Sequence, residues 1–298
     1  MGQRRYPIMS LLVALKLGRV SNLPTVWSNT VAAIVLTGGT VTSAAAPTLL
    51  AAMTLFYLGG MYLNDAFDAD IDARERPERP IPAGQIARTT VFCVGFFLLS
   101  GGLALLCLAA YQSPEHTGVW PGASGVILAG AIVFYNWHHK GNVLSPVVMG
   151  LCRLLIYVSV GLCFAVVLPL ALLLGAVSLF SYLIGLTYVA KQENLGEVKN
   201  LWPMLFLAAP IVYGGVLGSE AWSTMAYVVI FVVVIGAALW LVRRRQPGDI
   251  PRAVVTLIAG MSLLDAILIS GAGAPGLALV AVLGFALTLG LQRVVSGT

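Results

Sequence analysis

Apolar runs long enough to cross a bilayer recur along this whole 298-residue chain, and they constrain its fold more than any other feature. A membrane-crossing helix needs about 17–25 predominantly apolar residues. Runs of this kind occupy residues 20–38, 46–64, 89–111, 119–137, 144–164, 167–190, 201–218, 222–242, 252–271 and 275–293. The residues before position 20 are expected to form a short surface helix that leads into the first run. The pattern predicts an all-α, polytopic bundle of transmembrane helices.

The composition excludes an ordinary soluble domain. Hydrophobic residues make up 59% of the chain and charged residues only 10%, whereas a soluble domain carries roughly 25% charged residues. No shift in composition and no low-complexity linker divides the sequence, so we expect residues 1–298 to form a single integral-membrane domain. Glycine pairs inside the runs, such as Gly59-Gly60, would let membrane helices approach closely.

The basic residues are distributed asymmetrically between the connections. The connections after the second, fourth, sixth and eighth runs carry Arg74, Arg76, Arg79, Arg88, Lys140, Lys191, Lys199, Arg243, Arg244, Arg245 and Arg252. The intervening connections contain no Lys or Arg. The positive-inside rule then places both termini and all the charged loops in the cytoplasm, with the protein in the cell inner membrane. The net charge of +5 suits an anionic leaflet and gives no reason to expect a nucleic-acid partner.

Carboxylates cluster at the end of the second run, where six of the twelve acidic residues lie close together. On a continuous helix Asp65, Asp68 and Asp72 share one face, and Asn64 lies beside Asp68. Asp70 lies off this face and is expected in solvent. Carboxylates this close repel one another unless cations lie among them, and oxygen ligands suit Mg²⁺, which usually also holds substrate phosphates. The cluster therefore predicts a magnesium–phosphate site at the edge of the membrane.

The sixth run ends in a weaker version of this pattern. Glu193 and Glu197 are four residues apart, as are Asp68 and Asp72, so each pair is separated by about one helical turn. Two facing acidic helix ends could share two metal ions around one diphosphate.

The string from Asn64 to Asp72, with the following sequence from Arg79 to Gly84, resembles the first motif of the UbiA superfamily of membrane prenyltransferases. The resemblance implies a bundle of nine to ten spans in which two carboxylate motifs bind Mg²⁺ and the diphosphate of an isoprenoid donor. The second motif of the family follows a Tyr and a Lys, and that place is occupied here by Tyr188, Lys191, Glu193 and Glu197. Glutamates thus replace the usual aspartates. The residues around Lys191 also resemble the UbiA-like branch called EboC.

The expected reaction transfers a prenyl group from a polyprenyl diphosphate to an aromatic or lipid acceptor. The expected catalytic residues are Asp65, Asp68, Asp72, Lys191 and Tyr188, and the expected metal ligands are Asn64, Asp65, Asp68, Asp72, Glu193 and Glu197. The expected substrate-binding residues are Asn64, Arg79, Arg74, Arg153, Arg19 and Asn22. Metal ions and Lys191 would neutralise charge on the departing diphosphate, over which Arg74 or Arg79 could close. The ring faces of Tyr62, Tyr135 or Tyr188 could stabilise the carbocation.

Two charged residues lie inside apolar runs, where charges are costly and usually paired or functional. Arg153 is in the fifth run and Asp265 is in the ninth. They could pair with each other, or Arg153 could reach the acceptor or the diphosphate. Arg19 and Asn22, at the start of the first run, could line the acceptor side.

Other interpretations stay open at this point. The loop arginines, Lys191 and the two glutamates could serve only topology or solvation. Residues Arg153 and Asp265 also fit a cation-coupled transporter, and the glutamate variant of the second motif fits a UbiA-like protein that binds isoprenoids without turnover. His138 and His139 lack a second pair of metal ligands and are expected to anchor the chain at the interface.

Overall fold

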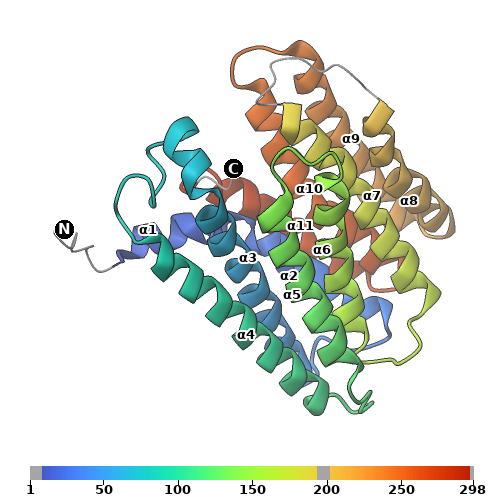
Figure 1. The fold of residues 1–298 in the computed structure, drawn as a ribbon. Coiled ribbons are helices and arrows are strands. Elements are labelled where there is room, and N and C mark those ends of the chain that lie inside the picture. Colours follow the sequence, from blue (N-terminus) through green and yellow to red (C-terminus); the bar gives the residue numbers. More distant parts are fainter. Residues whose placement is uncertain (1–8, 193–201, 296–298) are drawn as a thin grey trace.

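The computed structural model describes residues 9–192 and 202–295, and over these residues it is helical (Figure 1). The helices are α1 (Leu11–Leu17), α2 (Leu23–Leu36), α3 (Ala45–Glu75), α4 (Arg88–Gln112), α5 (Trp120–His138), α6 (Ser145–Gly161), α7 (Leu170–Gln192), α8 (Ala208–Glu220), α9 (Trp222–Arg244), α10 (Asp249–Gly271) and α11 (Pro275–Leu291). Short 3₁₀ helices, η1 (Val20–Asn22) and η2 (Trp202–Leu207), precede α2 and α8.

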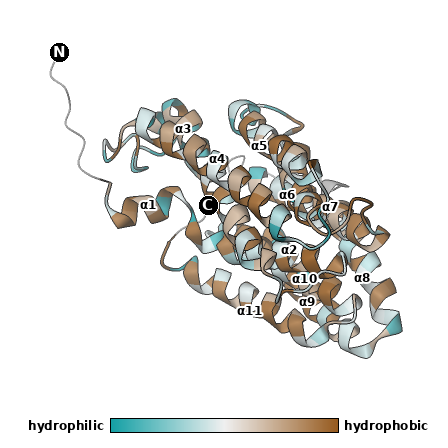
Figure 2. Cartoon of the chain, turned by 90° about the horizontal axis from the view of Figure 1, so that it is seen from below, coloured by the Kyte–Doolittle hydropathy of each residue, from teal (hydrophilic) through white to brown (hydrophobic). Residues whose placement is uncertain are grey.

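Each apolar run of the sequence corresponds to one α-helix, preceded by η1 in the first run and by η2 in the seventh. Helices α3, α4, α7, α9 and α10 are long and apolar enough to cross a membrane by length and composition, and α6, α11 and the α8 region are shorter apolar helices. The predicted all-α, multi-pass membrane bundle is confirmed. In Figure 2 the hydrophilic residues gather in the connections, whereas the helices are mainly hydrophobic.

Helix α10 forms the centre of the bundle and packs against α2, α7, α8, α9 and α11. A second close pair is α3 with α4, where glycines allow the backbones to meet. A Cβ atom added at Gly59 would lie 2.9 Å from the carbonyl oxygen of Gly95, which is too close for any larger residue. The small residues therefore serve helix packing, as the sequence predicted.

The carboxyl-terminal ends of α3, α5, α7 and α9 lie at one end of the bundle, the upper end in Figure 1. Contacts between them confirm this for the first three. His139, after α5, lies 3.4 Å from Asp68 of α3, and Lys191 of α7 donates a hydrogen bond to the carbonyl of Asn142 in the α5–α6 connection. The start of the α5–α6 connection therefore lies against the end of α3, and the end of α7 contacts the same connection.

Candidate active site at the end of α3

Helix α3 continues without a break through the carboxylate cluster, so the predicted shared face forms. Asp65, Asp68 and Asp72 are all buried, with exposed fractions of 6%, 5% and 2%. Asp70 is on the other side of the helix, exposed, and pairs with Arg88 at 2.9 Å. The helix therefore sorts four aspartates of similar sequence context into three buried carboxylates and one solvated carboxylate.

Two arginines neutralise the two ends of this face. The Arg19 guanidinium lies 3.1 Å from the Asp65 carboxylate and 2.9 Å from the side-chain oxygen of Asn64. The Arg79 guanidinium, from the connection after α3, lies 2.8 Å from Asp72 and 3.4 Å from Asp65. Arginine N–H groups match carboxylate oxygens in charge and geometry. Asp65 is therefore held from both sides, by residues that come before and after α3.

Arg19 adopts an unusual backbone conformation between α1 and η1. Its φ is +42°, in the left-handed region that residues other than glycine rarely adopt. The Tyr57 hydroxyl donates a hydrogen bond to its carbonyl at 3.1 Å. Burial lowers the pKa of the Arg19 guanidinium, but the Asp65 carboxylate, together with Tyr57 and Tyr135, more than offsets this, so the pKa lies above its ordinary value. Arg19 is thus fixed as a cation at the face of α3 that carries Asp65, Asp68 and Asp72, which we call the carboxylate face.

Asp68 has no arginine partner among the described residues and faces the α5–α6 connection instead. The His139 ring nitrogen Nε2 is 3.4 Å from its carboxylate and the Lys140 ammonium is 3.8 Å away. The His139 ring also stacks on Tyr135, with centroids 4.9 Å apart. His139 therefore lies against the carboxylate face, whereas the sequence suggested only that it anchors the chain at the membrane interface.

Asn64 connects the carboxylate face to α5. Its side-chain nitrogen donates to the side-chain oxygen of Asn136 at 3.1 Å, and Asn136 in turn donates to the Gly60 carbonyl at 3.0 Å. Its oxygen accepts the Arg19 hydrogen bond described above. This chain of amides fixes the orientation of Asn64 beside the aspartates.

The remaining expected residues are placed in different ways. Lys191 lies at the same end of the bundle, with its ammonium 2.8 Å from the Asn142 carbonyl, and Tyr188 is half-buried one turn earlier on α7. Arg74 is exposed and turns back to the Asp70 carbonyl on its own helix. Glu193 and Glu197 lie outside the described residues.

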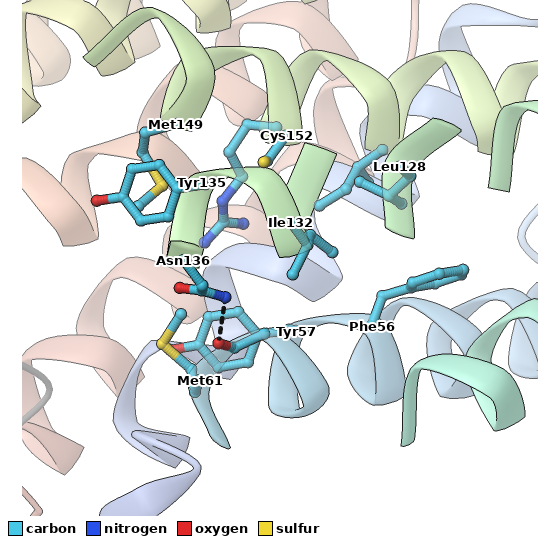
Figure 3. A pocket seen from close by; sticks show the side chains of 12 residues that line it. Phe56, Tyr57, Met61, Leu128, Ile132, Tyr135, Asn136, Met149 and Cys152 are labelled. Atoms are coloured by element: carbon cyan, nitrogen blue, oxygen red, sulfur yellow. Dashed lines mark hydrogen bonds between the residues drawn. The ribbon is translucent and has the colours of Figure 1, made fainter. Parts of the chain in front are cut away.

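A cavity of about 270 Å³ lies next to the carboxylate face, because Arg19, which pairs with Asp65, is one of its lining residues. Further lining residues come from η1, α3, α5, α6, α7 and α10. A smaller apolar cavity of about 90 Å³ lies beside it between α3, α5 and α6. Figure 3 shows the smaller cavity with Phe56 and Tyr57 of α3 on one side and Met149 and Cys152 of α6 on the other. Tyr57 and Tyr135 line both cavities.

Tyr62 lines neither of these two cavities. Its hydroxyl donates to the Ala14 carbonyl at 3.3 Å, and its ring packs with Val13 and Leu17 of α1. The aromatic residue of α3 that lines both cavities is Tyr57, which the sequence analysis missed. Tyr57 precedes Asn64 by seven residues, so it lies on the same face of α3, and this spacing was the available signal.

The two charges inside the bundle are linked through an amide. The Arg153 guanidinium donates to the Asn29 side-chain oxygen at 2.7 Å, and the Asn29 nitrogen donates to both oxygens of Asp265 at 3.0 and 2.8 Å. Asp265 also accepts hydrogen bonds from Ser28 and Tyr157. The direct Arg153–Asp265 pair that the sequence suggested is therefore replaced by an indirect one, because α2 packs against both α6 and α10.

The oxygens at the end of α3 suit a hard cation. Three buried carboxylates and one amide form an oxygen-only donor set of the kind Mg²⁺ takes. Within residues 9–192 and 202–295, no group of three or more His, Cys, Asp or Glu side chains is drawn together as a metal site. Asp65 and Asp72 are paired with arginines instead. Asp68 lacks such a partner there and lies beside His139 and Lys140, so a cation at Asp68 would displace no arginine.

The comparisons with known proteins agree with this arrangement. Residues 23–193, more than half of the chain, match the UbiA prenyltransferase family. The chain belongs to this family, and the expected class of protein, a UbiA-type prenyltransferase, is confirmed. The match covers the carboxylate face, the whole lining of the smaller cavity and the α3–α7 part of the larger cavity. The EboC-like branch stays a prediction.

Individual relatives are similar over shorter stretches. Digeranylgeranylglyceryl phosphate synthase of Methanopyrus kandleri is 33% identical over 107 residues, covering 32% of this chain and 34% of that protein. The synthase of the same name from Methanothermobacter thermautotrophicus is 34% identical over 110 residues, covering 35% and 36%. The chain thus matches about a third of the length of these curated relatives.

A solved structure from work on the biosynthesis of digeranylgeranylglyceryl phosphate synthase in membranes has the same fold. It superposes with a TM-score of 0.61 over 87% of this chain and 97% of the other, at 17% sequence identity. At this identity the likeness concerns the fold alone. The helical bundle, and not only the first motif, is therefore that of the family.

Proposed function

We propose that this protein transfers a prenyl group from an allylic isoprenoid diphosphate to an aromatic or lipid acceptor, with Mg²⁺ as cofactor. The observation that carries the proposal is the face of α3, where three buried carboxylates stand beside a cavity large enough for a small acceptor. The names of the relatives point to a prenylated glyceryl phosphate as one class of product.

The diphosphate is expected at the carboxylate face. Mg²⁺ held by Asp65, Asp68 and Asp72, and by the glutamates of the second motif, would neutralise charge on the diphosphate as it leaves. Arg79 and Lys191 supply cations on the same side of the bundle. The C1–O bond of the donor breaks, and its electron pair leaves with the diphosphate. The acceptor atom then bonds to C1 and loses a proton.

The cavities supply the environment for the reacting carbon. The rings of Tyr57 and Tyr135 line both cavities, where they can stabilise an allylic cation through their faces. The smaller cavity is lined almost entirely by apolar side chains, such as Leu128 and Ile132, which suits an isoprenoid chain. Exclusion of water from these cavities would protect the cation from hydrolysis.

We place the carboxylate end in the cytoplasm, together with both termini. The support is the charge pattern, because the connections around the end of α3 carry the basic residues. Accessibility of a cysteine at position Glu78, measured in inside-out and right-side-out vesicles, tests this orientation. Labelling only in inside-out vesicles is expected, and labelling only in right-side-out vesicles would reverse it.

The test of the reaction is pyrophosphate release by the purified protein. Geranyl, farnesyl and geranylgeranyl diphosphate are supplied in turn, with a membrane extract as the source of acceptors and with either Mg²⁺ or EDTA. Release that requires Mg²⁺ and differs between donors supports the proposal. Mg²⁺-dependent donor binding without release would indicate an isoprenoid-binding protein, and the absence of both would favour ion transport.

A further inference from the structure

An arginine forms part of the larger cavity away from the carboxylate face. Arg153 of α6 is only 8% exposed, and it lines both cavities. Its guanidinium carbon lies 5.9 Å from the centre of the Tyr57 ring. Because Tyr57 precedes Asp65 by eight residues on α3, the two levels are about 12 Å apart along the helix. Arg153 therefore belongs to a different level of the cavity from the expected diphosphate site.

The Arg153 guanidinium is only partly satisfied by protein atoms. One N–H group donates to Asn29 at 2.7 Å and another to the Thr25 hydroxyl at 3.0 Å. An arginine has five N–H donors. Within the described part of the chain the other three have no protein acceptor. A buried guanidinium with free donors on a cavity wall is suited to a carboxylate or phosphate group.

The counter-charge of Arg153 is arranged so that it does not occupy these donors. Asp265 is fully buried, and its carboxylate is held by Asn29, Ser28 and Tyr157. Asn29 lies between the two charges, so Asp265 offsets the charge of Arg153 without contacting it. A direct ion pair would have consumed the N–H groups that remain available.

The lining of the larger cavity has a matching charge pattern. Arg19, Arg76 and Arg153 line it, and none of its lining residues is acidic. Most of the remaining lining is apolar, including Leu183 and Met261. A molecule that fits this lining carries one anionic group on an apolar body.

We propose that Arg153 binds the anionic group of the acceptor, a carboxylate or a phosphate, and that Asn29 and Asp265 are its positioning residues. That the bound molecule is the prenyl acceptor rests on the proposed function, whereas the anion site itself does not. The donor diphosphate is expected at the carboxylate face two helical turns away, so an anion at Arg153 belongs to a second molecule. That molecule is an aromatic carboxylate or a phosphate-bearing lipid.

Equilibrium binding to the full-length protein in detergent tests this site without any donor. Benzoate is compared with the neutral benzamide, and lysophosphatidic acid with the neutral monoacylglycerol. At least one anionic probe is expected to bind ten-fold or more tightly than its neutral partner. Preference within the first pair indicates an aromatic carboxylate, and preference within the second indicates a phosphate lipid. No preference within either pair overturns the proposal.

Variants then assign the site to Arg153. Arg153→Gln is expected to remove the preference for the anion, and Arg153→Lys to retain part of it. Arg88→Gln, at an arginine that lines neither cavity, should leave the preference unchanged. An unchanged preference in folded Arg153→Gln overturns the assignment. Because these measurements need no turnover, anion binding without pyrophosphate release would refute the proposed reaction and keep the site.

The positioning role of Asp265 is tested by asking whether a bound anion restores the thermal stability of a variant that lacks its charge. In Asp265→Asn the counter-charge is lost while the side-chain shape is kept. The preferred anionic probe should then raise the melting temperature of Asp265→Asn more than that of the wild type, because the anion replaces the missing charge. An equal or smaller rise in Asp265→Asn contradicts the role. Where this variant cannot be purified, Asn29→Ser is used, and an unchanged affinity for the probe contradicts the role.

Discussion

Carboxylates at the end of α3 are neutralised by direct contact with arginines, whereas the carboxylate of Asp265, deeper in the bundle, is neutralised through an amide. Asp65 and Asp72 are contacted by Arg19 and Arg79, whose side chains remain 18% and 16% exposed. Asp265 is completely buried and accepts only hydrogen bonds from uncharged groups. The two regions place the same chemical groups in different surroundings.

This difference in surroundings implies that the ion pairs at the end of α3 can rearrange, whereas the hydrogen bonds around Asp265 cannot. Ion pairs at the edge of the membrane are partly solvated, so their arginines can exchange one anionic partner for another at modest cost. Inside the bundle, leaving a charge unpaired costs much free energy, so the partners of a charged group there are fixed. We infer that the end of α3 is suited to take up and release a charged ligand, while the Asn29–Asp265 network maintains the bundle and the orientation of Arg153.

The largest expected effect is the loss of stability in Asp265→Ala. This substitution leaves Arg153 without its counter-charge in the interior, and breaking a buried pair in this way costs about 3–5 kcal/mol. Asp68→Ala relieves repulsion between Asp68 and the neighbouring carboxylates Asp65 and Asp72, so it should change the unfolding free energy much less than Asp265→Ala does. Unfolding in detergent measures both values. Equal stabilities of the two variants would contradict the distinction between the regions.

A double substitution sharpens this test. Arg153→Met with Asp265→Leu replaces both charges by apolar groups, which should restore much of the stability lost in either single variant. A coupling of at least about 1 kcal/mol is expected even though the two side chains do not touch, because Asn29 connects them. Additive losses would show that the amide does not couple the two charges.

A smaller effect is expected for Arg79→Gln at the edge. Loss of this guanidinium should raise KM for the isoprenoid diphosphate about ten-fold, which corresponds to about 1.4 kcal/mol. Initial rates at several donor concentrations measure the change. Arg88→Gln is the matched control, because Arg88 pairs with the exposed Asp70 and is expected to leave KM unaltered. A similar rise in KM in both variants would show that Arg79 acts only through the general surface charge and does not contact the donor.

The smallest effect is expected for the exposed pair itself. Asp70→Asn should change the unfolding free energy by less than about 0.5 kcal/mol, since exposed ion pairs contribute little. Thermal unfolding at low and high salt measures the difference. A fall of several degrees in the melting temperature at both salt concentrations would show that the exposed side of α3 contributes substantially to stability.

Much of this architecture could be predicted from the sequence. The length of the apolar runs predicted the helices, and the 3.6-residue period correctly separated Asp70 from the buried aspartates. Both follow from local patterns. The predicted roles of the site residues and of Mg²⁺ stay predictions, and the second motif, Glu193 and Glu197, lies outside the described residues.

The parts that could not be predicted depend on contacts between distant helices. Arg19 meets Asp65 because the residues before α2 pack beside α3, and its left-handed backbone has no signature in the sequence. Asn29 reads as an ordinary polar residue in an apolar run. Only the packing of α2 against α6 and α10 reveals it as the connection between Arg153 and Asp265.

The most direct test of the central claim compares two neighbouring aspartates on one helix. Pyrophosphate release with Mg²⁺ is measured for the wild type, Asp68→Asn and Asp70→Asn. We expect Asp68→Asn to lower the rate by about 100-fold or more, as loss of one electrostatic group at a reacting centre does, while Asp70→Asn keeps the wild-type rate. Equal rates in the two variants would contradict the claim that the buried face of α3 is the reacting end of the molecule.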